Sequence, residues 1–265
     1  MCLILVGIQA HPGSRVLLLA NRDEMHARAS AAAAPWQDDP RVLGGRDLVA
    51  GGSWLAVRSN GRFAAVTNLR NGAPVAAPRS RGDLVRDFVL GETSVPAYLA
   101  GLLPLLEQFA PFNLIAGDAD GVFVLDGGTR RIRQFGPGLH VVGNGPLDSE
   151  WPKARRLRLS AAACMDKQAS GISSLLSLLR DGAQAADDEL PDTGIGLERE
   201  RVLSSIFIEG ERYGTRASTV LDIGSGGTIR FCERSFGPVA IEYGDSTWDG
   251  AVASGWQPVS GATAG

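Results

Sequence analysis

The chain has 265 residues, of which 44% are hydrophobic, and a formal net charge of −3. This composition suits one large globular domain with an ample core, and we expect a single domain over residues 1–265. The slight negative charge argues against a nucleic-acid-binding protein. No apolar run is long enough to span a bilayer and no secretory signal is visible, so we expect a cytoplasmic protein without a membrane span.

The cysteines and histidines are few and widely spaced. The chain has three of each: Cys2, Cys164, Cys232, His11, His26 and His140. An odd number of cysteines, with no pair at metal-ligand spacing, indicates reduced thiols rather than a disulfide framework or a metal site. We therefore expect no metal and no required cofactor.

The first third of the chain is predicted to consist of strands joined by short turns. Four apolar runs predict these strands: Cys2–Ile8, Val16–Ala20, Ser53–Val57 and Phe63–Thr67. The last two flank Ser59-Asn60-Gly61, which favours a hairpin turn. We expect the segment Ala29–Asp47, rich in Ala, Pro and Gly, to be a loop.

Helices and strands alternate in the rest of the chain. Helical spacing of apolar residues predicts helices over Gly82–Leu90, from Ser94 to Phe109, over Pro152–Met165 and over Ile172–Arg180. Strands are predicted at Phe112–Gly117, Gly121–Leu125, Ile132–Phe135, His140–Val142, Thr215–Ile223, Thr228–Cys232 and Val239–Tyr243. The basic stretch Lys153, Arg155, Arg156 and Arg158 is interpreted as a solvated helix face.

This order of elements predicts the fold class. Antiparallel sheets that each carry a helical layer would bury both of their faces. We therefore expect an α+β fold, a four-layer αββα sandwich in a single domain.

Cys2 is the residue with the most evident chemistry. If Met1 is removed, Cys2 carries both a thiol, which is a nucleophile once deprotonated, and an α-amine with a reference pKa near ~7.7–8.0 that can take the proton. The alternative interpretation is a small buried hydrophobic residue at the start of a strand.

Four polar clusters stand at predicted strand ends or turns. They are Asn21-Arg22-Asp23-Glu24, Thr67-Asn68, Gly143-Asn144-Gly145-Pro146 and Tyr213-Gly214-Thr215-Arg216-Ala217-Ser218-Thr219. An arginine lowers the pKa of a nearby thiol, a carboxylate can hold an ammonium group, and asparagine amides can stabilise an oxyanion. Taken singly, each cluster is also compatible with an ordinary loop or turn.

Together these motifs resemble the NRDE domain family, also called the transport and Golgi organisation protein 2 family. The matching segments arrive in order from Cys2 to about Ile223: Met1-Cys2, Asn21–Glu24, Gly44–Asp47, Gly51–Leu55, Gly61–Phe63, Thr67-Asn68, Phe112–Leu114, Asn144, Leu147-Asp148, Trp151–Lys153 and Tyr213–Arg216. The family is in turn distantly similar to N-terminal-nucleophile (Ntn) hydrolases of the bile-salt hydrolase and penicillin V acylase type, which implies the same four-layer fold.

The resemblance to Ntn hydrolases implies a set of site residues. Carried onto this sequence they are Cys2, Arg22, Asn68, Asn144 and Arg216, with a carboxylate from either Asp23 or Glu24. The hydrolases space their acid as Arg-x-x-Asp, whereas the third residue after Arg22 is Met25. Arg22 and Glu24 would share one face of a strand and Asp23 the other, unless a turn intervenes.

Two functions are compatible with this set. The first is a hydrolase with amidase or acyl-transfer chemistry on a small amide or thioester, with Trp36 and Trp54 either lining its pocket or packing in the core. The second, implied by the family, is a non-catalytic carrier of a hydrophobic cargo such as haem, acyl-coenzyme A or lipid. In that case Cys2 or His26 could ligate haem iron. The oligomeric state is left open.

Overall fold

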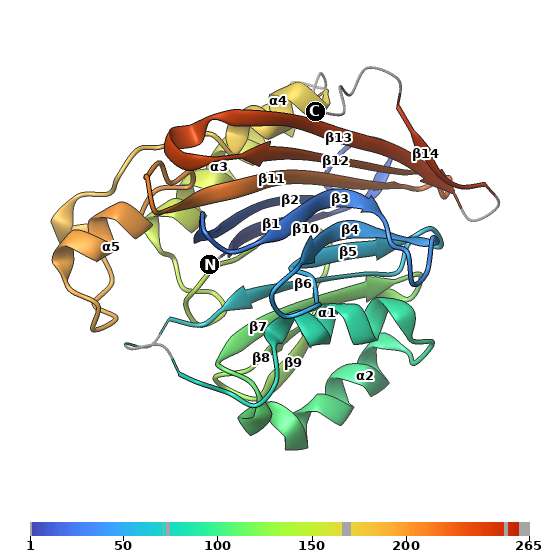
Figure 1. Cartoon of the computed structure of the whole chain (residues 1–265), viewed down its shortest axis with the longest axis horizontal. Helices are drawn as coiled ribbons and strands as arrows, with labels where there is room; N and C mark the ends of the chain where they lie inside the picture. Colours follow the sequence, from blue (N-terminus) through green and yellow to red (C-terminus); the bar gives the residue numbers. More distant parts are fainter. Residues whose placement is uncertain (1, 71, 73–74, 166–170, 252–253, 260–265) are drawn as a thin grey trace.

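The computed structural model describes residues 2–70, 72, 75–165, 171–251 and 254–259. Its strands form two antiparallel sheets of seven strands each, which pack against one another (Figure 1). The prediction of a mixed α and β fold is confirmed, and the buried clusters show how helices and sheets meet.

Sheet A has the strand order β10-β1-β2-β11-β12-β13-β14. In chain order its strands are β1 (Cys2–Ile8), β2 (Ser14–Met25), β10 (Gly138–Val142), β11 (Tyr213–Gly224), β12 (Ile229–Phe236), β13 (Glu242–Ala251) and β14 (Gly255–Pro258). The N-terminal strand β1 therefore lies inside the sheet, between β10 and β2.

Sheet B follows the order of the sequence from β3 to β9. Its strands are β3 (Ser30–Pro35), β4 (Val42–Asp47), β5 (Leu55–Arg58), β6 (Phe63–Asn68), β7 (Phe112–Asp118), β8 (Gly121–Asp126) and β9 (Arg131–Gln134). β3 is an edge strand, and it also contacts β12 and β13 of sheet A.

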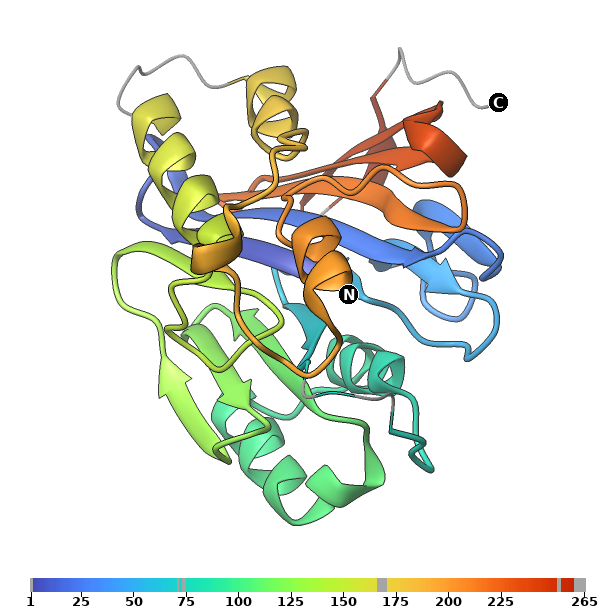
Figure 2. The same ribbon diagram turned by 90° about the vertical axis from the view of Figure 1, so that its left-hand side faces the viewer.

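Two pairs of helices cover the sheets on opposite sides of the molecule (Figure 2). α1 (Arg81–Leu90) and α2 (Val95–Leu102) pack on sheet B, and α3 (Pro152–Met165) and α4 (Ile172–Leu178) pack on sheet A. The remaining helix, α5 (Leu197–Leu203), and three short 3₁₀ turns (Leu103–Gln108, Asp187–Glu189 and Pro238–Ala240) lie in connections.

Alternation along β1 and β2 separates two of the three buried clusters. Successive strand residues point to opposite faces. The cluster between the two sheets takes one set of side chains, namely Cys2, Ile4, Val6, Val16, Leu18 and Ala20. The cluster beneath α3 and α4 takes the other set, Leu3, Leu5, Leu17 and Leu19. Cys2 and Arg22 thus belong to the face that looks toward sheet B.

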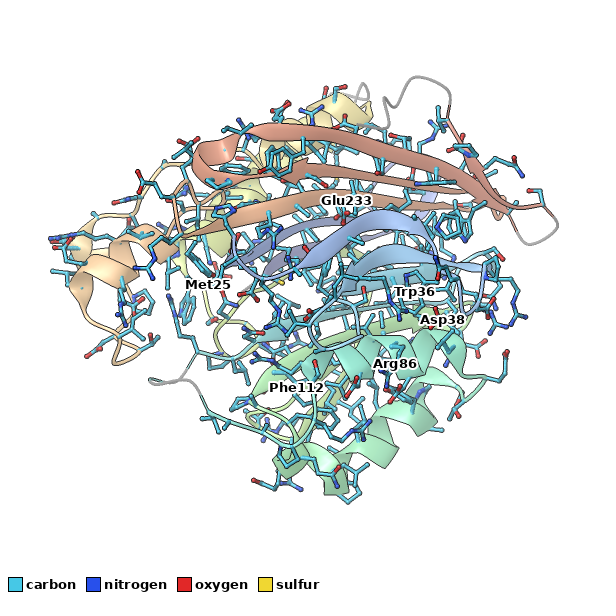
Figure 3. All side chains as sticks on the ribbon, viewed as in Figure 1. Met25, Trp36, Asp38, Arg86, Phe112 and Glu233 are labelled. Atoms are coloured by element: carbon cyan, nitrogen blue, oxygen red, sulfur yellow. The ribbon has the colours of Figure 1, made fainter. Side chains whose placement is uncertain are left out.

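The prediction of a loop over Ala29–Asp47 is wrong, because this segment contains β3 and β4. Alanine has a low intrinsic preference for strands, so local sequence gave little signal. β3 is held by its antiparallel pairing with β4 and by a tertiary contact, in which the Ala33 amide donates a 2.8 Å hydrogen bond to Oε1 of Glu233 on β12. Glu233, labelled in Figure 3, lies where β12 faces β3.

Other boundaries also differ from the predictions, and two elements were not predicted. The helix expected to reach Phe109 leaves α-geometry at Leu103, next to Pro104, whose ring cannot donate the backbone hydrogen bond of an α-helix. The strand expected from Val239 begins instead at Glu242, because Val239 sits in a turn with φ of 48°. α5 and β14 were not predicted, since both are short and lack clear periodicity.

Candidate functional site

Cys2 lies in the wall of a pocket of about 260 Å³ between the ends of the two sheets. Five residues predicted for the site line this pocket: Cys2, Arg22, Asp23, Glu24 and Asn68. Cys2 itself is only 8% exposed. The pocket therefore brings the thiol and most of the predicted polar set together, with the sulfur-bearing residue recessed in the wall.

The Asn-Arg-Asp-Glu segment lies within strand β2, rather than after it. Cys2 pairs directly with Arg22 in the register of β1 and β2. Because β2 continues to Met25, alternation applies to the whole segment. Arg22 and Glu24 fall on the Cys2 side, and Asp23 falls on the side of the helical layer.

Burial dominates the electrostatics of the thiol. Loss of solvent raises the pKa of Cys2, the negative charge of Asp23 raises it further, and the positive charge of Arg22 lowers it. Arg81, from the first turn of α1, lines the same pocket and interacts electrostatically with Cys2. The thiol is therefore protonated at rest, with two arginines placed to stabilise the thiolate once it forms.

Arg22 is held by an aromatic ring. Its guanidinium carbon lies 4.2 Å from the ring centroid of Trp54, a cation–π distance. Gly45 gives this ring its space, because a Cβ at that position would lie 2.2 Å from the Trp54 ring atoms Cη2 and Cζ2. The Gly44-Gly45 and Trp54 motifs thus act together to place Arg22.

Asp23 is almost completely buried on the other side of the strand. Its Oδ1 accepts a 2.7 Å hydrogen bond from the Thr215 hydroxyl. Burial raises the pKa of Asp23, and the nearby charge of Lys153 opposes that rise. Glu24 lies at the half-exposed end of the strand, where one carboxylate oxygen accepts the Met25 amide at 2.8 Å. Asp23 is thus the buried acid and Glu24 the accessible one.

Lys153 is a residue of this region that the sequence interpretation missed. The prediction of a solvated basic face is wrong for Lys153, which is 2% exposed, whereas Arg155, Arg156 and Arg158 form surface ion pairs. Burial lowers the pKa of Lys153 to about 8, against the charge of Asp23, which raises it. Its position directly after Trp151-Pro152, at the start of α3, was the available signal.

Asn144 lies behind the pocket rather than in its lining. Its side chain is fully buried; Nδ2 donates to the Asn68 carbonyl at 3.0 Å, and Oδ1 accepts from Nζ of Lys153 at 3.3 Å. The Arg70 amide donates to the Asn144 carbonyl at 2.7 Å. Asn144 therefore ties Asn68, which does line the pocket, to the buried lysine.

Arg216 does not line the Cys2 pocket. It stands at an irregularity in the pairing of β11 with β2, between Thr215 and Ala217. Its guanidinium donates to the backbone carbonyls of Met25 and Arg28 and faces a different cavity. At this irregularity Arg216 has no partner residue on β2, and its side chain lines the cavity that Arg22 also lines.

The mouth of the pocket carries further charge. Arg28 forms an ion pair with Asp47, with 2.7 Å between Nη2 and Oδ2. Both residues line the pocket, together with Arg79 and Arg81. Of these cations, Arg28 is paired with Asp47 and Arg79 with Asp87 at 3.0 Å.

The two tryptophans considered for the pocket have different roles. Trp36 packs in the cluster between sheet B and its helices, and its Nε1 donates to the Gly44 carbonyl at 2.9 Å. Trp54 lines the Cys2 pocket. The core interpretation therefore holds for Trp36 and the pocket interpretation for Trp54.

A larger, mainly apolar cavity of about 790 Å³ adjoins the Cys2 pocket. The two share Asn68, Val75, Arg81 and Ala110 in their linings. Other side chains come from α5 and its surroundings, among them Ile195, Val202, Leu203 and Tyr213. His26 lines none of the cavities described here; one of its ring nitrogens, Nε2, lies 3.1 Å from the Gly210 carbonyl.

Comparison with known protein families identifies the family to which a chain with this fold and a recessed Cys2 belongs. The family model described as "Transport and Golgi organisation 2" matches residues 1–238. The chain belongs to this family, as the ordered motifs had indicated. Among the described residues, no helix combines the length and apolar character needed to cross a membrane.

Curated relatives cover nearly the whole chain. The Transport and Golgi organization protein 2 homolog of Bos taurus is 31% identical over 257 residues, 89% of this chain and 93% of the relative. The Homo sapiens homolog is 31% identical, with the same coverage of 89% and 93%. The Drosophila melanogaster protein is 30% identical and is covered over 92% of its length, with 89% of this chain.

Two solved structures are similar at a lower level. An orthologue of N-acylethanolamine-hydrolyzing acid amidase from Caenorhabditis elegans aligns with a TM-score of 0.42 and 12% identity, over 83% of this chain and 92% of that one. A C2A mutant of the conjugated bile acid hydrolase from Clostridium perfringens aligns with a TM-score of 0.47 and 10% identity, over 87% of this chain and 88% of the other.

Proposed function

We propose that this protein is a hydrolase-like enzyme that uses Cys2 as its nucleophile, with amidase or acyl-transfer chemistry on a small amide or thioester. One observation carries the proposal: Cys2 lines a pocket together with Arg22, Glu24 and Asn68, and Arg81 joins them from α1. A recessed thiol beside cations and an amide donor is an arrangement that supports acyl transfer, because the cations stabilise the thiolate and the amide can donate to the oxyanion.

The reaction would proceed in two steps. After removal of Met1, the Cys2 α-amine takes the thiol proton, and the thiolate forms a C–S bond to the substrate carbonyl. The carbonyl carbon then loses its amine or thiol leaving group, which departs with that proton. Water attacks the resulting thioester, the C–S bond breaks, and the carboxylic acid and free thiol are released.

The surrounding residues would each take one part. Arg22 and Arg81 offset the penalty that burial places on the thiolate. Asn68 supplies a donor toward the developing oxyanion, and Asn144 positions Asn68 through the 3.0 Å bond to its carbonyl. Asp23 or Glu24 orients the ammonium group. Arg216, which faces another cavity, has no direct part in this scheme.

Intact-mass measurement, followed by assay of a panel of acyl amides and thioesters, tests the proposal. We expect a mature chain that begins at Cys2, and a loss of turnover of about 1,000-fold or more in Cys2→Ala. Cys232→Ala is the matched control, because Cys232 is also a buried free thiol but lies on β12 beside Thr247. Equal hydrolysis by the wild type and Cys2→Ala would contradict the proposal.

The apolar cavity beside the pocket favours a second candidate function, that of a carrier. A volume of about 790 Å³ with a mainly apolar lining suits a hydrophobic cargo such as haem or an acyl chain. Titration of the protein with hemin, followed by the Soret band, tests the haem version in the wild type, Cys2→Ala and His26→Ala. Absence of a saturable shift in the wild type would remove it.

A further inference from the structure

A cleft of about 640 Å³ lies between the two sheets, apart from the Cys2 pocket. We call it the inter-sheet cleft; it is bounded by β3 on one side and by β11, β12 and β13 on the other. The alanines of β3 at positions 31–34 line it, and their small side chains leave the space unfilled. Among the described residues, only Arg22 and Trp54 line both this cleft and the Cys2 pocket.

Two arginines in the cleft have no carboxylate partner. Among the residues that the structure describes, no ion pair is formed by Arg22 or by Arg216. Nη1 of Arg216 donates hydrogen bonds to backbone carbonyls, whereas its buried Nε has no hydrogen-bond partner within the described part of the chain. A buried guanidinium donor without an acceptor costs free energy, and an anionic ligand would remove that cost.

The carboxylates that line the cleft are already engaged. Glu233 accepts hydrogen bonds from the Ala33 amide at 2.8 Å and from the Thr219 hydroxyl at 3.3 Å. Asp245 forms a bidentate pair with Arg234, at 2.7 and 2.9 Å. Glu233 also lies within electrostatic reach of Arg22: burial raises the pKa of that carboxyl, and the charge of Arg22 opposes the rise. Arg216 is thus the cation lining the cleft that remains available to an anionic ligand, with Arg22 beside it.

Aromatic rings give the cleft a shape preference. Trp54, stacked on Arg22, forms one wall, and Trp248 and Tyr243 of β13 lie on the opposite side. Nε1 of Trp248 is buried and, within the described residues, makes no hydrogen bond. Flat apolar walls beside unpaired cationic and indole donors match a planar ring that carries an anionic group.

We propose that the inter-sheet cleft binds a planar organic anion, an aromatic carboxylate or phosphate, whose anionic group contacts Arg22 and Arg216 while its ring packs between Trp54 and Trp248. This binding does not depend on turnover at Cys2, since Cys2 does not line the cleft. The proposal therefore stands or falls separately from the enzymatic one.

Isothermal titration with four small probes tests the ligand class. The probes are phenyl phosphate and benzoate as anions, benzamide as a neutral analogue and benzylamine as a cation. We expect saturable binding of both anions, at least about 10-fold tighter than that of benzamide, and no binding of benzylamine. Binding of benzamide as tight as that of benzoate, or no saturable binding of either anion, would overturn the proposal.

Variants locate the binding within the molecule. Arg216→Gln is expected to weaken phenyl phosphate binding about 10-fold or more, and Trp248→Phe, which removes only the indole donor and part of the ring, about 3-fold. The control Arg230→Gln removes a cation from the same sheet that pairs with Asp249 outside the cleft, and it should change the affinity less than 2-fold. Cys2→Ala should bind like the wild type.

A cleft-filling variant keeps the test decisive if Arg216→Gln fails to fold. Ala32 lines the cleft and is exposed, so Ala32→Trp should fold and occupy the space where the probe ring would lie. We expect it to weaken anion binding at least about 10-fold. Unchanged affinity in Ala32→Trp would place the anion elsewhere and overturn the proposal.

Discussion

The two faces of strand β2 differ in their surroundings. Arg22 and Glu24 look toward sheet B, where open cavities meet them, whereas Asn21 and Asp23 alternate to the other face and are buried, although Asp23 also contributes to the lining of the Cys2 pocket. On the open face, Arg22 makes a ring contact and no ion pair among the described residues. On the enclosed face, Asn21 and Asp23 are both hydrogen-bonded to residues of β11.

One face of β2 mainly stabilises the fold, and the other mainly contributes side chains to the candidate site. A buried polar group must find hydrogen-bond partners inside the protein. On the enclosed face, the loss of any one of these hydrogen bonds therefore lowers the stability of the fold. A group at a cavity can remain available for a ligand. One four-residue motif therefore anchors the fold through the hydrogen bonds of Asn21 and Asp23, and it lines the Cys2 pocket with Arg22, Glu24 and Asp23.

Asn21→Leu should have the largest effect, and it should act on stability. Nδ2 of Asn21 donates to the carbonyls of Leu179 and Ile206, both at 2.8 Å, and Oδ1 accepts from the Ser218 hydroxyl at 2.6 Å. The variant leaves three buried groups without a partner, which should lower the free energy of unfolding by about 3–5 kcal/mol. Urea denaturation measures this change.

An exposed asparagine provides the control for that measurement. Asn60, in the turn between β5 and β6, accepts one hydrogen bond from the Arg62 amide at 3.1 Å and is open to solvent. Asn60→Ala should cost about 1 kcal/mol or less. If Asn21→Leu costs no more than this, the enclosed face is not the anchor that we describe.

Lys153→Met should change the pH dependence of stability. The pKa of Lys153 is lowered in the folded protein to about 8, from an ordinary value of 10.5. Between these values the unfolded chain binds more protons than the folded one, so the wild type gains stability as the pH rises from 8 to 10.5. The variant lacks this gain, which should amount to about 3 kcal/mol at most.

Chemical denaturation at several pH values from 7 to 11 measures that gain as the difference between wild type and variant. Arg158→Met is the control, since Arg158 pairs with Glu150 on the surface and does not titrate in this range. A constant difference between the wild type and Lys153→Met over the whole range would show that the lysine has the same pKa in the folded and unfolded chains.

The core of the site could be predicted from sequence because it depends on one strand pair. Cys2 and Arg22 stand opposite each other once two apolar runs are paired through a short turn, and Asn68 follows the end of a clear hairpin. The choice between Asp23 and Glu24 was left open, because it depended on whether β2 continued past Arg22. The structure shows that it does.

The features that escaped prediction depend on contacts between distant segments. Lys153 resembles its basic neighbours in sequence, and only the packing of α3 on sheet A buries it. β3 pairs with β4, and Glu233, 200 residues away, accepts a hydrogen bond from its Ala33 amide. Arg216 lies on β11, which is separated from β1 by β2, and it stands at a pairing irregularity that no periodicity reveals.

Arg22→Met should act on the thiol rather than on the fold. The positive charge of Arg22 lowers the pKa of Cys2, so its removal should move the pH of half-maximal alkylation by iodoacetamide upward by about one unit. The alkylation rate of Cys2 at pH 7.5 should fall about 10-fold. Cys164, which is half-buried on α3, is the internal reference because no change is expected there.

A matched surface variant separates this effect from a general change in charge. Arg230→Met removes a cation from sheet A that is paired with Asp249 and lies outside the Cys2 pocket. Its alkylation profile should match the wild type. The same upward shift in both variants would mean that Arg22 acts only through the net charge of the protein.

Glu24→Gln should give the smallest effect, in the opposite direction. The charge of Glu24 raises the pKa of Cys2, but by less than Arg22 lowers it, because Glu24 lies at the half-exposed end of β2 where water screens the interaction. The alkylation midpoint should therefore fall by a few tenths of a unit, about 0.3. An upward shift would mean that the Glu24 carboxylate instead holds Arg22 or Arg81 close to the Cys2 sulfur. In that case the effect of Glu24 on the thiol would depend on the arginines.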